Sequence, residues 1–119
     1  MKSILLLLFL GVWNITLFAQ QSNYQIKGNL KDAENGEVID FAEITLHKEG
    51  ENQILSKALP DKKGEFFFNH IADGNYIIMV RLIGYDVFIS KPLKLTKESK
   101  INLGEIKLKP LEVGLSEVE

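Results

Sequence analysis

The chain has 119 residues, of which 14 are lysine or arginine and 16 are aspartate or glutamate, giving a formal net charge of -2. Because these charges form no basic block, nucleic acid is not expected as a partner. Cysteine is absent, which excludes disulfide bonds, a thiolate nucleophile and thiolate-bound zinc, so one small packed core must stabilise the fold.

Residues 1–19 differ from the rest of the chain. Lys2 precedes the apolar run ILLLLFLGVW, and the small residue Ala19 stands where a signal peptidase would cut. The alternative is an uncleaved membrane anchor, but a membrane-spanning helix needs about 20 predominantly apolar residues. Asn14 and Thr16 interrupt this run too early for that. We therefore predict a signal peptide over residues 1–19 and an exported protein.

The segments that follow predict strands, because apolar and polar residues alternate between turn-forming residues. Residues 24–30 (YQIKGNL) alternate and include Gly28. Residues 41–48 (FAEITLHK) alternate again. Between these two strands, the segment KDAENGE supplies a turn at Asn35 and Gly36.

Residues 53–59 (QILSKAL) predict a weaker strand, and residues 60–65 (PDKKGE) predict a tight reversal in which Gly64 adopts a positive φ. Together with residues 65–71 (EFFFNHI), this reversal predicts a hairpin. Alternation buries either Phe67 or both of its neighbours, so core packing explains these aromatic residues better than a sugar-stacking platform does. An exposed, coplanar aromatic pair would favour the platform.

Residues 76–83 (YIIMVRLI) are almost continuously apolar, which predicts a central strand covered on both faces. Residues 86–93 (DVFISKPL) and 101–110 (INLGEIKLKP) predict further strands. Seven or eight strands with short turns and no predicted helix indicate a β-sandwich.

The stretch VRLIGYDVF places Gly84 and Tyr85 between two of these strands. We predict that Gly84 allows a bend or bulge where a side chain would obstruct the turn. Tyr85 is predicted to pack its ring inward and to find a hydrogen-bond partner for its hydroxyl group. The pair is therefore interpreted as a corner of the fold.

Three segments, in this order and spacing, resemble the carboxypeptidase-regulatory-like domain of many TonB-dependent outer-membrane receptors and related β-barrel proteins of Bacteroidetes-type bacteria. They are IKGNLKDAENGEVIDFAEITL, LPDKKGEFFFNHIADGNYIIMVRLIGYDVF and INLGEIKLKPLEVGLSEVE. The matching motif positions are Gly28, Gly36, Asp61, Gly64, Phe66, Gly74, Tyr76, Gly84 and Tyr85. The resemblance implies a seven-stranded, transthyretin-like (Ig-like, Greek-key) β-sandwich over residues 24–109.

The end of the chain resembles the family's closing segment, where a TonB-contacting box and a plug domain begin. Leu115, Glu117 and Val118 match this segment and are expected to contact a partner. Residues 110–119 are therefore predicted to be a linker toward a plug. Because the chain stops at Glu119, before any plug or barrel strand, we expect a fragment, a truncated product or a stand-alone domain.

The resemblance implies a non-catalytic module in the periplasm, at the outer membrane, placed ahead of the plug and barrel of a receptor. Its partners would be TonB, the plug or barrel, and a partner lipoprotein, and it would meet the membrane only through the barrel. One alternative is a stand-alone secreted module that binds carbohydrate or protein. Another is an accessory domain of a secreted peptidase, which fits the fold but not the LSEVE ending.

Neither histidine lies in a zinc-site pattern. A zinc hydrolase needs three protein ligands, often two histidines and a carboxylate at short fixed spacing. His47 is followed three positions later by Gly50, and His70 has no acidic residue at that spacing. Both histidines are therefore expected to lie near strand ends, partly exposed and without a metal ion.

The segment DAENGE has some features of a calcium loop, in which glycine stands at position six. With Asp32 as position one, the glycine falls at position five, so a turn is predicted instead. None of the candidate serine nucleophiles lies in a G-x-S-x-G elbow: Ser22, Ser56, Ser90, Ser99 and Ser116. We therefore expect no enzyme activity, no cofactor and no bound metal.

Overall fold

The computed structural model describes residues 24–112, and every regular element in this range is a β-strand. That part of the chain accordingly has no helix that could cross a membrane. The strands are β1 (Ile26–Asp32), β2 (Glu43–Lys48), β3 (Ile54–Ala58), β4 (Glu65–Phe68), β5 (Gly74–Arg81), β6 (Phe88–Ile89), β7 (Leu93–Leu95) and β8 (Ile101–Leu108). The predicted all-β fold is confirmed, whereas the implied count of seven strands is wrong, because the described residues form eight.

The additional strand arises because the segment predicted as one strand over residues 86–93 divides into β6 and β7. Pro92 interrupts it, since proline has no N–H group to donate to a neighbouring strand. Ser90 N donates to Ile78 O at 2.9 Å, and Ser90 Oγ accepts from Ile78 N at 2.9 Å. The Ser90 hydroxyl thus takes the place of a backbone carbonyl as the acceptor for Ile78 N, and the segment between β6 and β7 remains bonded to β5.

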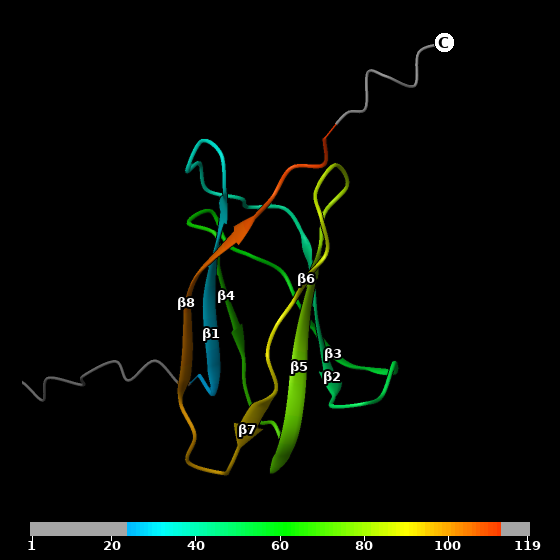
Figure 1. The fold of residues 1–119 in the computed structure, drawn as a ribbon. Helices are drawn as coiled ribbons and strands as arrows, with labels where there is room; N and C mark the ends of the chain where they lie inside the picture. The colour runs from blue at the N-terminus through cyan, green and yellow to red at the C-terminus, as the bar shows by residue number, and fades with distance from the viewer. Residues whose placement is uncertain (1–23, 113–119) are drawn as a thin grey trace, which may run out of the picture.

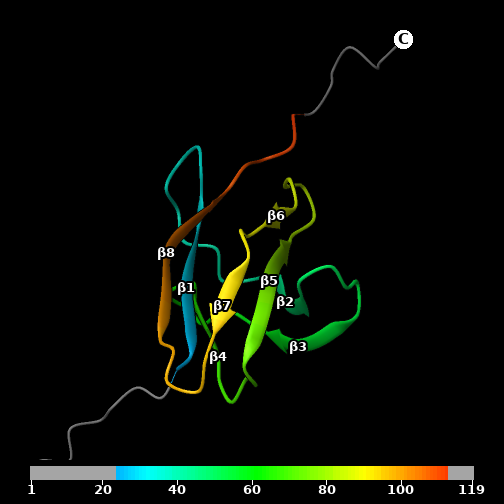
Figure 2. The same cartoon turned by 60° about the horizontal axis from the view of Figure 1, so that its bottom comes forward.

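The strands form two sheets that face each other, as Figures 1 and 2 show from two directions. One sheet has the order β4-β1-β8, in which β1 is antiparallel to β4 and parallel to β8. The other has the order β3-β2-β5-β6, and β7 also pairs with β5. The architecture is therefore the predicted β-sandwich.

Alternate side chains from both sheets fill the space between them. Along β5, Tyr76, Ile78 and Val80 are buried, whereas Ile77 and Met79 on the other face are partly exposed. The strand is central, as predicted, but only its inner face is fully covered. The buried apolar core consists of Ile26, Leu30, Ile39, Ala42, Ile44, Leu46, Phe66, Phe68, Tyr76, Ile78, Val80, Leu95, Ile106 and Leu108.

The reversal over residues 60–65 joins the two sheets and does not close a hairpin, so that prediction is wrong. β3 pairs with β2, whereas β4 pairs with β1. Leu30 N donates to Gly64 O at 2.9 Å, which begins the pairing with β1. This crossing to the other sheet places Phe66 and Phe68 in the core, where their apolar rings are removed from water.

Candidate binding site

Two of the predicted motif glycines lie against aromatic rings of the core. A Cβ atom added at Gly28 would lie 2.5 Å from Phe66 Cε1, and one at Gly74 would lie 3.3 Å from Tyr76 Cε2. The Tyr76 hydroxyl donates to Ala72 O at 2.7 Å, which connects this ring to the turn before β5. These motif residues therefore serve the packing of the sandwich.

Asp61 organises the turn that precedes β4. Its Oδ1 accepts from Lys63 N at 2.8 Å and from Glu65 N at 2.9 Å. Gly64 N donates to Asp61 O at 2.9 Å, and Gly64 itself is buried with a φ of 77°. The positive φ predicted for Gly64 is therefore confirmed, and both residues act in the turn.

Asp32 and Tyr85 connect two loops at the end of β1. The Tyr85 hydroxyl donates to Asp32 Oδ2 at 2.6 Å. Asp32 Oδ1 accepts from Glu34 N at 2.8 Å and from Asn35 N at 3.2 Å, and Gly36 N donates to Asp32 O at 3.0 Å. Asp32 is thus the partner of the Tyr85 hydroxyl, and it brings the Asn35–Gly36 turn and Tyr85 together.

Gly84 is the third residue of a turn in which Tyr85 N donates to Leu82 O at 3.1 Å. Its φ is 89°, and an added Cβ would meet no atom within 4 Å. The predicted bend is present, but the predicted obstruction by a side chain is wrong. Glycine suits this position because the left-handed conformation strains other L-residues.

The contact between Tyr85 and Asp32 changes the acidity of both groups. The hydrogen bond from Tyr85 lowers the pKa of the Asp32 carboxyl group, and the backbone N–H groups of Glu34 and Asn35 lower it further. Burial acts in the opposite direction and raises this pKa, but its effect is smaller. The same hydrogen bond, with burial and the nearby negative charges, raises the pKa of the Tyr85 hydroxyl. The pair therefore stabilises the fold between the two titrations and loses that effect at both extremes.

Tyr85→Phe should lower the Tm by about 5 °C near neutral pH, because it removes this hydrogen bond and keeps the ring. The difference from wild type should shrink as the pH falls through the lowered pKa of Asp32, and again as the pH rises through the raised pKa of Tyr85. Thermal melts followed by circular dichroism across this pH range measure the effect. A difference that stays constant with pH would contradict the role of the pair.

The chain that follows β8 runs along the Gly84 turn. Asp86 N donates to Lys109 O at 2.8 Å, and Leu111 N donates to Gly84 O at 2.8 Å. The last described residues therefore leave the sandwich at this end, shown in red in Figure 1. The residues predicted to contact a partner lie outside the described range: Leu115, Glu117 and Val118.

This end, here called the exit end, carries large apolar side chains in solvent. Phe41 is 77% exposed and Ile83 is 99% exposed. With Leu82 and Val87 they line an open groove of about 430 Å³. Leu111, which is half exposed, lies beside the Gly84 turn, because its N–H donates to Gly84 O. Contiguous exposed apolar residues are typical of surfaces that meet another surface.

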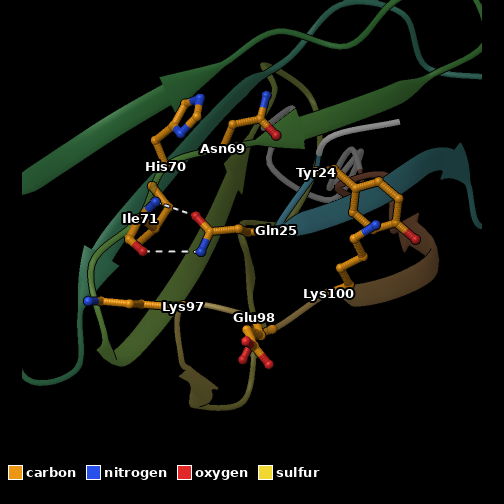
Figure 3. Close-up of a pocket in the computed structure, with 9 residues that line it drawn as sticks. Tyr24, Gln25, Asn69, His70, Ile71, Lys97, Glu98 and Lys100 are labelled. Carbon is orange, nitrogen blue, oxygen red and sulfur yellow. Dashed lines mark hydrogen bonds between the residues drawn. The ribbon is translucent and has the colours of Figure 1, made fainter. Parts of the chain in front are cut away.

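A hollow of about 380 Å³ lies at the other end of β1 and is shown in Figure 3. Gln25 holds one wall in place: its Nε2 donates to Ile71 O at 3.2 Å and its Oε1 accepts from Ile71 N. His70 is exposed and has a φ of 56°, a conformation uncommon outside glycine. The lining residues are Tyr24, Gln25, Asn69, His70, Ile71, Lys97, Glu98, Ser99 and Lys100.

Two aromatic rings and two lysines gather beside this hollow. The ring centroids of Tyr24 and Phe67 are 6.2 Å apart, and the ring planes are inclined by 50°. Lys27 Nζ lies 5.8 Å from the Tyr24 centroid and 5.9 Å from that of Phe67, and Lys100 Nζ lies 5.9 Å from the Tyr24 centroid. Because the ring planes are tilted, Tyr24 and Phe67 are not the coplanar pair that would favour a stacking platform made of two parallel rings.

Sequence reasoning missed this cluster of rings and lysines. Lys27 and Phe67 are direct partners in the β1–β4 ladder, although they lie far apart in the chain. The alternation of β4 already allowed Phe67 to point outward, but only the pairing register shows which residue stands opposite it. The cluster could therefore be recognised only after the strands were paired.

His47 is buried at 6% exposure, so the predicted partial exposure is wrong for this residue. Its Nδ1 lies 3.1 Å from Gln53 O and donates to that carbonyl, while Nε2 lies 2.8 Å from Thr45 Oγ1. The ring is thus held between Thr45 of the same strand and the loop before β3. His70 is exposed, as predicted. Within residues 24–112, no group of three or more metal-ligating side chains is arranged to hold an ion.

Comparison with solved structures finds similar folds at low sequence identity. A proposed carbohydrate-binding protein from Bacteroides uniformis has 18% identity and a TM-score of 0.50, with 71% of this chain and 40% of that chain covered. A shaft pilin domain from Lactobacillus rhamnosus has 20% identity and a TM-score of 0.49, with 76% of this chain and 100% of that domain covered. Likeness at this level shows the fold alone.

A type II cohesin–X-dockerin complex from Acetivibrio cellulolyticus gives a TM-score of 0.49 at 17% identity, with 67% of this chain covered. The chain spans only about half of that chain, at 51%. No curated protein matches the sequence at a significant level.

A family model provides the assignment that these structures do not. The model described as the carboxypeptidase regulatory-like domain matches residues 25–109, which is well over half of the sequence. The match covers both sheets, the Asp32–Tyr85 contact and the Gly84 turn. The chain therefore belongs to the carboxypeptidase regulatory-like domain family.

Proposed function

We propose that this domain is a non-catalytic, exported module that stands ahead of the plug and barrel of a TonB-dependent outer-membrane receptor. The family match supports a regulatory-like module and names no catalytic activity. The signal-peptide pattern of residues 1–19 supports export to the periplasm. The segment LEVGLSEVE supports a following receptor, since it resembles the junction between such a domain and a plug.

The observation that carries this proposal is the geometry of the exit end. The chain after β8 is hydrogen-bonded to the Gly84 turn, so it leaves beside Ile83, which lines the exposed groove together with Phe41. A domain that follows in the same polypeptide would meet this apolar surface first. Covering such side chains removes apolar area from water, which favours docking at this end.

The receptor context is tested by the genomic DNA downstream of the Glu119 codon. We expect an open reading frame that continues into a plug and into amphipathic strands of about ten residues each. A stop codon directly after Glu119, found in independently sequenced isolates, would overturn the receptor context.

Export is tested separately, by expression of the full chain in a Gram-negative host. Mass spectrometry of the periplasmic fraction should find an amino terminus at Gln20, directly after Ala19. The matched control is Leu6→Arg, which places a charge in the apolar run and should leave the leader uncut in the cytoplasm. Uncut wild-type protein retained in the cytoplasm would contradict export.

A further inference from the structure

We infer that the hollow beside Tyr24 binds an acidic saccharide, a sugar that carries a carboxylate, such as a hexuronate. This inference goes beyond the proposed receptor context and does not depend on it. Two members of the cluster of rings and lysines, Tyr24 and Lys100, line the hollow and are labelled in Figure 3. The other two, Phe67 and Lys27, lie against the Tyr24 ring.

The charge of this region favours an anionic ligand. Lys97 and Lys100 line the hollow and Lys27 lies beside it, whereas Glu98 is the acidic residue in the lining. The ion pairs formed among residues 24–112 are Lys31–Glu105 and Lys57–Glu43, so none of these three lysines is neutralised by a carboxylate. The local excess of positive charge contrasts with the net charge of -2 of the whole chain.

The contacts with the rings hold the ammonium groups near the surface of the hollow. Lys27 and Lys100 both lie within 6 Å of the Tyr24 centroid, at 5.8 Å and 5.9 Å, a separation at which a cation is attracted to a ring. An ammonium group in such a contact keeps its N–H donors available to an acceptor. The Tyr24 and Phe67 rings add apolar area, so the site suits a ligand with both a carboxylate and a C–H face.

The backbone of the hollow argues for a small ligand over a peptide. A peptide that adds to a sheet edge needs free backbone N–H and C=O groups. At Ile71 both groups are already bonded to the Gln25 side chain. Recognition in the hollow therefore depends on side chains. The volume of about 380 Å³ is within the range of small-molecule pockets.

The test compares two disaccharides that differ in charge, digalacturonate and galactobiose, by NMR titration of the purified full chain. We expect digalacturonate to shift the amide signals of residues 24–27, 67–71 and 97–100, and galactobiose to have little effect. Added salt should weaken the binding, because the contacts are between exposed charges. Equal responses to both sugars, or no response to digalacturonate, would overturn the inference.

Variants of single charges locate the site. Lys27→Gln and Lys100→Gln should each weaken digalacturonate binding by about two- to fivefold, the usual effect of one exposed charge pair, and Glu98→Gln should strengthen it by a similar factor. Lys62→Gln, in the exposed turn before β4, is the matched control and should change nothing. If Lys62→Gln weakened binding as much as Lys100→Gln, the binding would be non-specific electrostatic attraction, and the proposed site at the hollow would be wrong.

Tyr24 separates the effect of the ring from that of charge. Tyr24→Phe should retain binding, whereas Tyr24→Leu should weaken it by about two- to tenfold, the range for one aromatic contact. A thermal melt of each variant verifies that it is folded. A triglutamate peptide tests the rival ligand class: if it bound as tightly as digalacturonate, the saccharide assignment would be wrong.

Discussion

Replacing Gly64 by alanine is expected to lower the free energy of unfolding by about 3 kcal/mol. Gly64 has a φ of 77°, which strains any residue with a Cβ atom. The added Cβ would also lie 2.7 Å from Leu30 O and 3.0 Å from Asn29 Oδ1. Leu30 O belongs to the central strand of its sheet and cannot move aside without disturbing the ladder. Urea denaturation followed by circular dichroism measures the loss.

Gly84→Ala is the matched control for this substitution. Gly84 has a similar φ of 89°, but a Cβ atom there would meet nothing within 4 Å. Only the strain of the left-handed conformation applies, and the expected cost is about 1–2 kcal/mol. If the two alanine variants lost the same stability, the close approach of Gly64 to Leu30 would not matter.

Gly28→Ala is expected to cost about 2–3 kcal/mol, for a different reason. Gly28 stands directly opposite Phe66 in the ladder, and the ring of Phe66 occupies the space where a side chain would be. Phe66 is fully buried and packs edge-on against Phe68, with centroids 6.1 Å apart. The ring therefore has little room to turn away from a new methyl group.

A double-mutant cycle tests this explanation. Phe66→Leu alone should destabilise the domain, because it leaves a cavity in the core. In the Phe66→Leu background, however, Gly28→Ala should cost clearly less than in wild type, because the ring that it meets is gone. Additive effects of the two substitutions would show that the clash between positions 28 and 66 is not the cause.

The local parts of the fold were predictable from residue pattern and turn chemistry. Alternation along residues 24–30 and 41–48 identified strands, because side chains of a strand point to opposite faces in turn. Gly64 was assigned a positive φ, since glycine tolerates it. The family was also recognisable from the sequence, through the order of its turns and apolar runs.

Errors arose where the outcome depended on a partner far away in the chain. The reversal at residues 60–65 was predicted to close a hairpin, yet β4 pairs with β1, which places Phe66 in the core. His47 was predicted to be partly exposed near a strand end, yet it is buried and hydrogen-bonded to the carbonyl of Gln53 in the following loop. Ser90 lies within the strand predicted over residues 86–93, yet its hydroxyl accepts from Ile78 N, where that strand divides into β6 and β7.

The sequence by itself determined that this chain is a β-sandwich of the carboxypeptidase regulatory-like family, because strand periodicity and turn residues act over a few neighbouring positions. Only the tertiary structure decided that Tyr85 bonds to Asp32 and that Lys27 stands against Phe67. Pairing register and packing bring such residues together, and both are set by how the whole core fits. The rings and lysines of the candidate binding site are likewise brought together only by the tertiary structure.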